Sequence, residues 1–186
     1  MLVLASRSPR RLEILQQAGI PFVWRPSEVD ETPLPAETAR NYVMRIARAK
    51  AEAAAAEGIA TGEIVLGADT TVLIDGDILA KPLDAADARR MLHLLSGRRH
   101  SVLTGICLIA ESRAVEDCAE TGVWFAPLSS REIEDYAASA EPMDKAGAYA
   151  IQGLASKFVE RIEGCYFNVM GLPVALVYRH LRMLGA

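Results

Sequence analysis

A single carboxylate, Asp69, interrupts a run of apolar and small residues. The segment Val65–Ala68 leads into it, and two threonines, Thr70 and Thr71, follow directly before Val72–Ile74. Segments rich in Val, Ile and Leu are typical of buried strands. An ionised carboxylate at the end of such a strand is costly unless it is paired, hydrogen-bonded or bound to a metal. We therefore expect Asp69 to lie at a strand end and to be the reaction centre.

Basic residues cluster where a helix is expected to begin. Ser8 suits the N-cap of this helix and Pro9 suits its first position. The first turn then contains Arg10 and Arg11. A helix start offers free backbone N–H groups and a partial positive charge, so it binds phosphate well. Two arginines oppose the helix dipole there, and this arrangement makes sense if an anion binds.

Three lysines, Lys50, Lys81 and Lys145, come from separate segments, and Glu31 lies in an acidic loop. Polyphosphate chemistry uses both signs of charge. Cations neutralise the phosphate oxygens and the leaving group, whereas carboxylates hold a divalent metal or accept a proton from water. Taken alone, Glu31 and Lys145 are more simply explained as solvated loop charges, and Lys50 as a lysine that extends along a helix surface. No Walker loop, GxGxxG or HExxH motif is present.

The elements that must position these residues alternate between strands and helices. One long helix is expected from Pro35 to Glu57, and the polar segment Glu141–Gly153 is expected to be a functional loop because it lacks periodicity. Strands are expected at residues 2–5, 22–26, 64–68, 72–74, 77–79, 100–109, 115–125 and 158–162, and further helices after Ser8, Asp84, Ser129 and Pro173. This order predicts an α/β or α+β fold with a mixed sheet.

Composition excludes several classes of protein. The 186 residues carry a net charge of −4, which argues against a general nucleic-acid binder. No apolar run is long enough to span a membrane. The three cysteines lack CxxC spacing, and the three histidines lack metal-ligand spacing. A sparse set of cysteines fits a reducing compartment, so we expect a cytoplasmic protein with no nucleic-acid or membrane partner.

Short motifs follow one another along nearly the whole chain. They lie at residues 4–11, 67–70, 81–82, 95–97, 104–105, 141–147, 151–153 and 169–173. Together they resemble the Maf family of nucleoside triphosphate pyrophosphatases. The resemblance implies an α/β fold with an elongated mixed β-sheet flanked by helices and a cleft between two lobes, similar to the inosine triphosphatase fold. It also implies one Maf-like domain over residues 1–186 and a divalent cation, Mg²⁺ or Mn²⁺, and it is compatible with a homodimer.

The resemblance assigns roles to single residues. It implies cleavage of a nucleoside triphosphate between the α and β phosphates, with Asp69 as the proton acceptor. Asp69 and Glu31 would then lie at the metal. The phosphate-binding residues would be Ser8, Arg11, Lys50, Lys81 and Lys145.

Three further positions resemble the branch that acts on dTTP and UTP, namely Arg10, Thr70 and Gln152. A glutamine side chain both donates and accepts hydrogen bonds, which suits the amide-like edge of uracil or thymine. Two alternatives stay open: the same chemistry on 7-methyl-GTP or another modified nucleotide, and a nucleotide-binding regulator of division or septation with little turnover.

Overall fold

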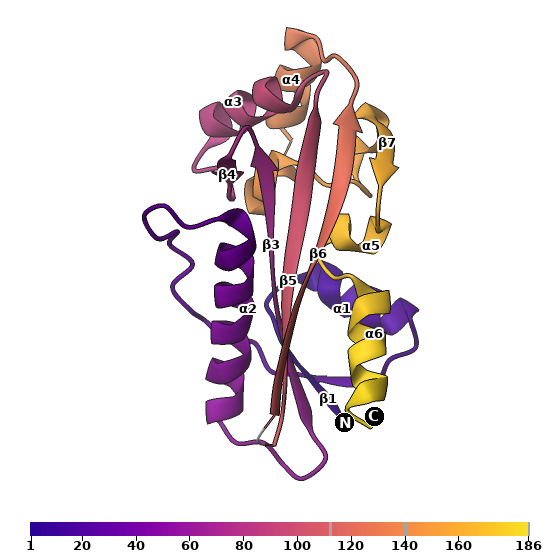
Figure 1. Ribbon diagram of the computed structural model, residues 1–186. Coiled ribbons are helices and arrows are strands. Elements are labelled where there is room, and N and C mark those ends of the chain that lie inside the picture. Colours follow the sequence, from indigo (N-terminus) through magenta and orange to yellow (C-terminus); the bar gives the residue numbers. More distant parts are fainter. Residues whose placement is uncertain (112, 140, 186) are drawn as a thin grey trace. The chain divides into compact units, whose positions relative to one another are not determined.

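The computed structural model describes residues 1–111, 113–139 and 141–185. Its strands join in one seven-stranded sheet (Figure 1). The strands are β1 (Leu2–Ala5), β2 (Phe22–Trp24), β3 (Ile64–Ile74), β4 (Asp77–Leu79), β5 (Arg99–Ala110), β6 (Arg113–Phe125) and β7 (Val159–Glu163).

Helices flank this sheet. The α-helices are α1 (Pro9–Gln17), α2 (Ala39–Ala56), α3 (Ala85–Leu95), α4 (Ser130–Ala137), α5 (Tyr166–Met170) and α6 (Val174–Met183). Three short 3₁₀ helices are η1 (Glu141–Asp144), η2 (Ala146–Ala148) and η3 (Leu154–Phe158). Within the described residues, no helix has both the length and the apolar character that crossing a membrane requires.

The sheet is mixed. Its strand order is β2-β1-β3-β5-β6-β7, and β4 pairs with β3. Strand β1 is parallel to both β2 and β3, whereas β4 is antiparallel to β3 and β7 is antiparallel to β6. The predicted α/β fold with a mixed sheet flanked by helices is therefore confirmed.

The chain divides into two compact units. Unit 1 contains Met1–Thr70, Thr104–Ala119 and Gly171–Ala186, and unit 2 contains Thr71–Leu103 and Glu120–Met170. Strands β3, β5 and β6 contribute residues to both units. The expectation of one domain over residues 1–186 stays a prediction.

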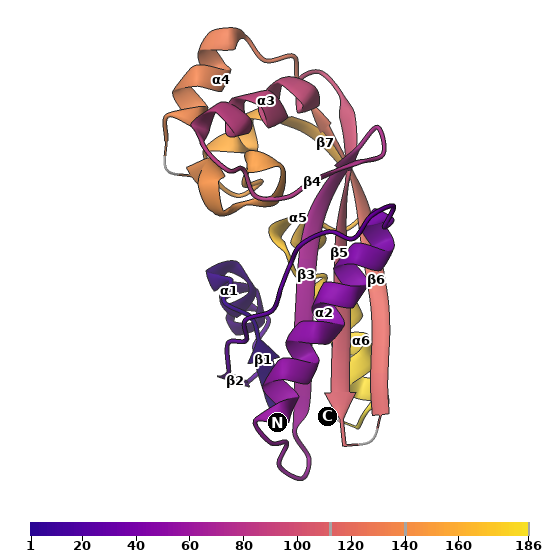
Figure 2. The same cartoon turned by 90° about the vertical axis from the view of Figure 1, so that its left-hand side faces the viewer.

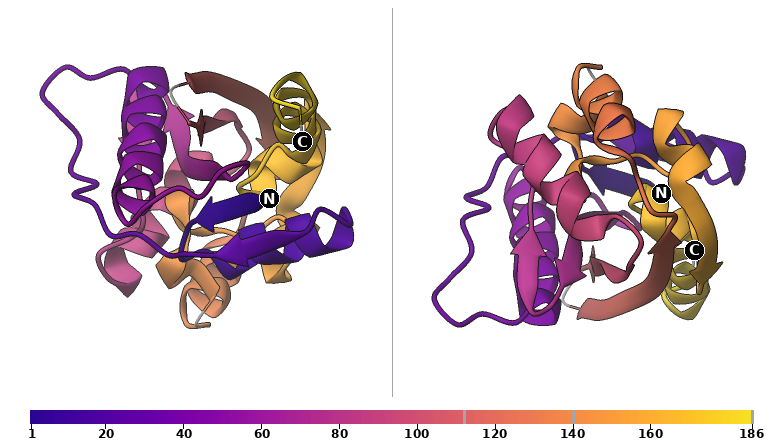
Figure 3. Two further views of the ribbon diagram at one scale, coloured as in Figure 1. Left: turned by 90° about the horizontal axis from the view of Figure 1, so that it is seen from below. Right: turned by 90° about the horizontal axis from the view of Figure 1, so that it is seen from above.

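In unit 1, α2 lies along one face of the sheet, and α1 and α6 lie on the opposite face (Figures 1, 2 and 3). The backbone of α2 touches the sheet directly. A Cβ atom on Gly67 of β3 would lie 2.1 Å from the Ala47 carbonyl oxygen, and one on Gly105 of β5 would lie 2.5 Å from that of Val43. Glycine is therefore required at both positions, and the close approach fixes where the side chains of α2 meet β3.

Aromatic side chains form part of the core of unit 2. The His100 ring packs edge-on against Phe125 and Tyr149, at centroid distances of 5.1 and 5.4 Å. Tyr136 of α4 packs in the same manner against Phe158 at 5.6 Å. All five side chains are buried. This core supports the segment between α4 and β7.

Local signals predicted several helix starts correctly. Asp84 caps α3, and Ser129 with Glu132 forms the predicted capping box of α4. The expected start of α2 at Pro35 is wrong, because Ala36 has a φ of 58° and Thr38 provides the N-cap. The segment predicted as the loop 141–153 contains η1 and η2, and α5 was not predicted at all.

Candidate active site

Asp69 lies inside β3 and not at its end, so that prediction is wrong. The residues after it, Thr70, Thr71 and Val72, are β-branched and continue the extended backbone to Ile74. The neighbouring strand β1 is shorter. Its last pair with β3 joins Ala5 and Gly67, and Asp69 comes after this pair. The carboxylate therefore lies beyond the C-terminal end of β1, close to where the chain turns into α1.

Asp69 belongs to a charged cluster on the α2 side of the sheet. Side chains alternate along a strand, so Asp69 points to the same face as Gly67, which touches α2. Its Oδ1 atom accepts a hydrogen bond from Lys50 Nζ at 2.8 Å, and the same Nζ lies 2.6 Å from Glu31 Oε1. Asp69 and Lys50 are both buried. The interpretation of Lys50 as a surface lysine is wrong, and one ammonium group joins two carboxylates.

The environment of Asp69 acts on its pKa in two directions. Burial raises the pKa of the carboxyl above its ordinary value, and the nearby positive charges of Lys50 and Arg11 oppose this rise. The bond to Lys50 is therefore the main local interaction that favours an ionised Asp69.

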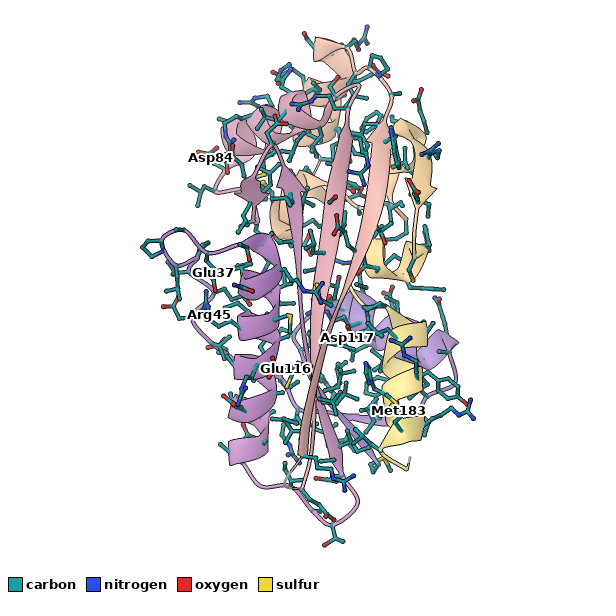
Figure 4. The ribbon with its side chains drawn as sticks, in the orientation of Figure 1. Glu37, Arg45, Asp84, Glu116, Asp117 and Met183 are labelled. Carbon is teal, nitrogen blue, oxygen red and sulfur yellow. The ribbon has the colours of Figure 1, made fainter. Side chains whose placement is uncertain are left out.

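The loop that carries Glu31 is fastened to α2. Tyr42 donates its hydroxyl hydrogen to the Glu31 carbonyl oxygen at 2.9 Å. Arg45 donates to the Thr32 carbonyl oxygen at 3.1 Å and pairs with both carboxylate oxygens of Glu37 at 2.7 Å. Glu37 and Arg45 lie together near the start of α2 (Figure 4). These contacts hold Glu31 beside Lys50 although the loop has no regular secondary structure.

A second cluster lies on the opposite face of β3, around Thr70. Arg11 is buried and donates from Nη2 to Thr70 Oγ1 at 3.1 Å. The hydroxyl groups of Thr70 and Thr104 are 2.9 Å apart. Arg11 also donates from Nε to the Gly171 carbonyl oxygen at 2.7 Å and from Nη1 to Ser6 Oγ at 2.9 Å. One guanidinium thus joins three segments that are distant in the sequence.

Burial and charge also act on Arg11. Burial lowers the pKa of its guanidinium, and the nearby carboxylate of Asp69 raises it. The two clusters are therefore electrostatically linked although they lie on opposite faces of β3. Three of the five N–H groups of an arginine side chain are used inside the protein here.

The start of α1 has the predicted N-cap but no hydrogen bond from the capping side chain. Ser8 occupies the N-cap, but its side chain caps no backbone N–H group. Its own backbone N–H donates to Ser6 Oγ at 3.2 Å. Pro9 follows in the first helical position, and Arg10 is half-buried. The Ser8 hydroxyl is therefore not committed to the helix.

The remaining predicted site residues belong to unit 2. Lys81 is exposed and follows β4. Lys145 donates to the Glu141 carbonyl oxygen at 2.9 Å and pairs with Asp144 at 2.5 Å. Gln152 is exposed. Within its own unit, Lys145 is therefore already engaged by neighbouring acceptors.

Unit 1 contains seven of the ten predicted site residues, and five of these meet in two clusters. Glu31, Lys50 and Asp69 form one cluster, and Arg11 and Thr70 form the other. Sequence reasoning did not assign the hydrogen-bond partner Thr104. The Thr104–Gly105 motif was the only available signal, because the contact depends on the register between β3 and β5.

Comparison with known proteins identifies the family of this chain. A family model described as Maf-like protein matches residues 1–184. A dTTP/UTP pyrophosphatase of Citrifermentans bemidjiense is 51% identical over 187 residues, covering 100% of this chain and 96% of its own. Proteins of the same name from Geobacter sp. (strain M21) and Anaeromyxobacter dehalogenans are 51% and 49% identical, with 96% and 94% of their own length covered.

A solved structure shares the fold. The Staphylococcus aureus Ham1 protein matches with a TM-score of 0.55 at 15% identity, covering 97% of each chain. This likeness concerns the fold alone. The match of the family model over residues 1–184, together with relatives that share about half of their residues with this sequence, shows that the chain belongs to the Maf-like protein family.

Proposed function

We propose that this protein is a nucleoside triphosphate pyrophosphatase of the cytoplasm that hydrolyses dTTP and UTP to the nucleoside monophosphate and pyrophosphate. The observation that carries this proposal is the buried Asp69, which Lys50 joins to Glu31. Relatives that share about half of the sequence bear the name dTTP/UTP pyrophosphatase, which supports the choice of substrate.

In the proposed reaction, Asp69 accepts the proton of the attacking water. A water oxygen attacks the α phosphorus, and the bond between this phosphorus and the oxygen that bridges to the β phosphate breaks. The electron pair leaves with pyrophosphate, and the proton of the attacking water passes to the Asp69 carboxylate. A proton acceptor must be ionised, and the ammonium of Lys50 at 2.8 Å supports the ionised form.

The carboxylate cluster suits a hard divalent cation. No group of three or more His, Cys, Asp or Glu residues suited to a metal is found in the described part of the chain. Mg²⁺ commonly uses one or two carboxylates and completes its shell with water and substrate phosphates. Glu31 and Asp69 already approach one positive centre, Lys50 Nζ, within 2.8 Å, and they would hold the ion. When bound, such an ion neutralises charge on the phosphates.

Other residues receive roles by the same proposal. Phosphate oxygens would be bound by Ser8, Arg11, Lys50, Lys81 and Lys145, and the base would be selected by Arg10, Thr70 and Gln152. The uncommitted hydroxyl of Ser8 at the start of α1 supports its part in this assignment. For Thr70, the bonds to Arg11 and Thr104 occupy its hydroxyl. Its methyl group is therefore the better candidate for contact with the base.

The test is pyrophosphate release from dTTP, UTP, CTP, GTP and 7-methyl-GTP with Mg²⁺ or Mn²⁺. We expect hydrolysis of dTTP and UTP, and we expect Asp69→Asn to lower the rate by about 10²- to 10⁴-fold. Asp135→Asn, on the exposed surface of α4, is the matched control and should retain full activity. Equal activity of Asp69→Asn and the wild type would refute the role of Asp69. A preference for a purine triphosphate would refute the proposed substrate.

A further inference from the structure

We propose that Glu141 is a positioning residue for base selection, because its carboxylate fixes the turn that presents Gln152. This inference rests on the proposed function, in which Gln152 contacts the base. It assigns to Glu141 an action through the backbone of unit 2, without contact with the substrate.

The Glu141 carboxylate is surrounded by donors from both sides of the turn. Its Oε2 atom accepts from the Leu154 backbone N–H at 3.0 Å, and its Oε1 atom accepts from that of Ala155 at 3.4 Å. Oε1 also accepts the hydroxyl hydrogen of Tyr136 at 2.8 Å. Hydrogen bonds to an ionised carboxylate are stronger than hydrogen bonds to a neutral acceptor. Glu141 therefore holds the two residues that come directly after Gly153.

The other side of the turn is held through Tyr136. The Ala150 backbone N–H donates to the Tyr136 hydroxyl at 3.3 Å, and this hydroxyl donates to Glu141. Within the turn, the Gly153 N–H donates to the Ala150 carbonyl oxygen at 3.0 Å. Tyr136 and Glu141 thus secure both ends of the segment that contains Gln152.

The Glu141 carboxylate lies so close to residue 153 that only glycine fits at this position. A Cβ atom on Gly153 would lie 2.2 Å from Glu141 Oε2 and 2.5 Å from both Cδ and Oε1. Such distances are far below van der Waals contact, so any other residue would push the carboxylate away. The turn and the carboxylate therefore fit each other closely.

The Gln152 side chain contrasts with this fixed backbone. It is exposed, and in the described part of the chain it makes no hydrogen bond. A polar side chain on a rigid backbone is suited to recognition, because the backbone loses little conformational freedom on binding. Loss of the carboxylate should therefore loosen the turn and weaken the selectivity that Gln152 provides.

The first experiment requires no activity. Amide hydrogen exchange is measured for residues 150–155 in the wild type and in Glu141→Gln, which keeps the size of the side chain but replaces one acceptor oxygen by a donor. We expect Leu154 and Ala155 to exchange about tenfold faster or more. The matched control is Glu132→Gln, which alters the capping box of α4 and should leave these amides unchanged. Unchanged exchange of Leu154 and Ala155 in Glu141→Gln would refute the proposed role of Glu141 in fixing the turn.

The second experiment tests the effect on selectivity. The ratio of kcat/KM for UTP to that for CTP is measured in the wild type, Glu141→Gln, Gln152→Ala and the double variant. We expect Glu141→Gln to lower this ratio about tenfold and to change it less than about twofold when Gln152 is already absent. Tyr136→Phe, which removes the hydroxyl between Ala150 and Glu141, should have a smaller effect in the same direction. It serves as the test if Glu141→Gln does not fold.

The outcomes separate the inference from the proposed function. Two results would overturn the positioning role and leave the proposed function intact. One is faster amide exchange in Glu141→Gln with an unchanged UTP-to-CTP ratio of kcat/KM. The other is a decrease in this ratio that is equally large with and without Gln152. Failure of the wild type to split any triphosphate would overturn the proposed function and the selectivity role with it. Faster amide exchange together with a decrease in the UTP-to-CTP ratio that depends on Gln152 would support both the positioning role and the proposed function.

Discussion

At the scale of single residues, the charge of Asp69 depends on Lys50. Burial alone disfavours an ionised carboxylate, and Lys50 Nζ lies within 2.8 Å of both Asp69 and Glu31. Asp69 and Lys50 therefore each need the other to remain charged, because both are buried and neither is well solvated by water.

Replacing Lys50 by Met should leave the buried Asp69 without its hydrogen-bonded ammonium partner. We expect the free energy of unfolding at neutral pH to fall by about 3 kcal/mol, because breaking a buried ion pair leaves one charge uncompensated. Activity should fall with it. Chemical unfolding followed by circular dichroism measures the first effect.

The control for Lys50 is Arg48→Met on the same helix. Arg48 is exposed and pairs with Glu52 and Glu116 at the surface. Surface pairs contribute little, so its unfolding free energy should stay near that of the wild type. An equal loss in the two variants would contradict a special role of the buried pair.

The hydroxyl group of Thr104 is expected to hold Thr70 in place. Thr104→Val keeps the shape of the side chain but removes the hydrogen bond of 2.9 Å. We expect a loss of about 1 kcal/mol in unfolding free energy and a weaker preference for UTP over CTP. Thr104→Ser retains the hydroxyl and should retain the preference. An unchanged preference in Thr104→Val would show that Arg11 and the Gly171 carbonyl oxygen hold the Thr70 hydroxyl without help from Thr104.

At the scale of elements, α2 and β3 define the site together. The backbone of α2 lies against Gly67, and this contact brings Lys50 to the level of Asp69. The helix thus acts as a rigid support for the ammonium group.

Gly67→Ala should push α2 away from β3. Its Cβ atom would meet backbone atoms of Ala47 and Ala51, which cannot move separately. Overpacking of this kind costs about 1–3 kcal/mol, and pyrophosphate release should fall because Lys50 moves with the helix. Gly122→Ala is the control, since its nearest atom belongs to the flexible Arg99 side chain. Equal effects of the two changes would contradict the close contact.

Elements were predictable where their signals are local. The cap at Asp84, the capping box of Ser129 and Glu132, and the Asp75–Gly76 turn follow from a few neighbouring residues. The position of Asp69 inside β3 was not predictable in this manner. An apolar run, a polar residue and a second apolar run fit two strands as well as one, and only pairing with neighbouring strands distinguishes them.

The contacts of the site were the hardest part to predict. The burial of Lys50 depends on the packing of α2, and the Thr70–Thr104 bond depends on strand register. Short motifs identified most of the residues but gave no partner for any of them. The five-residue helix α5 was missed because it is too short to show helical periodicity.

At the scale of the whole molecule, acid should weaken the fold through His100. Burial lowers the pKa of His100 from 6.5 to about 4 in the folded protein. The unfolded chain therefore binds a proton first as the pH falls, and stability decreases between about pH 6.5 and pH 4. The decrease should reach about 3 kcal/mol from this group alone.

The measurement is the unfolding free energy at pH 7 and pH 4.5 for the wild type and His100→Gln. We expect the variant to be less stable at pH 7, because the ring packs against Phe125 and Tyr149. The variant should also lose less stability on acidification. The same loss in both proteins would assign the acid sensitivity to other groups.

In the proposed reaction, Asp69 promotes attack of water on the α phosphorus. Hydrolysis of UTP in H₂¹⁸O, followed by mass spectrometry of both products, tests it most directly with the wild type beside Asp69→Asn. We expect one ¹⁸O atom in UMP and none in pyrophosphate, and a rate at least about 10²-fold lower in the variant. Label in pyrophosphate or inorganic phosphate, or an unchanged rate in Asp69→Asn, would contradict it.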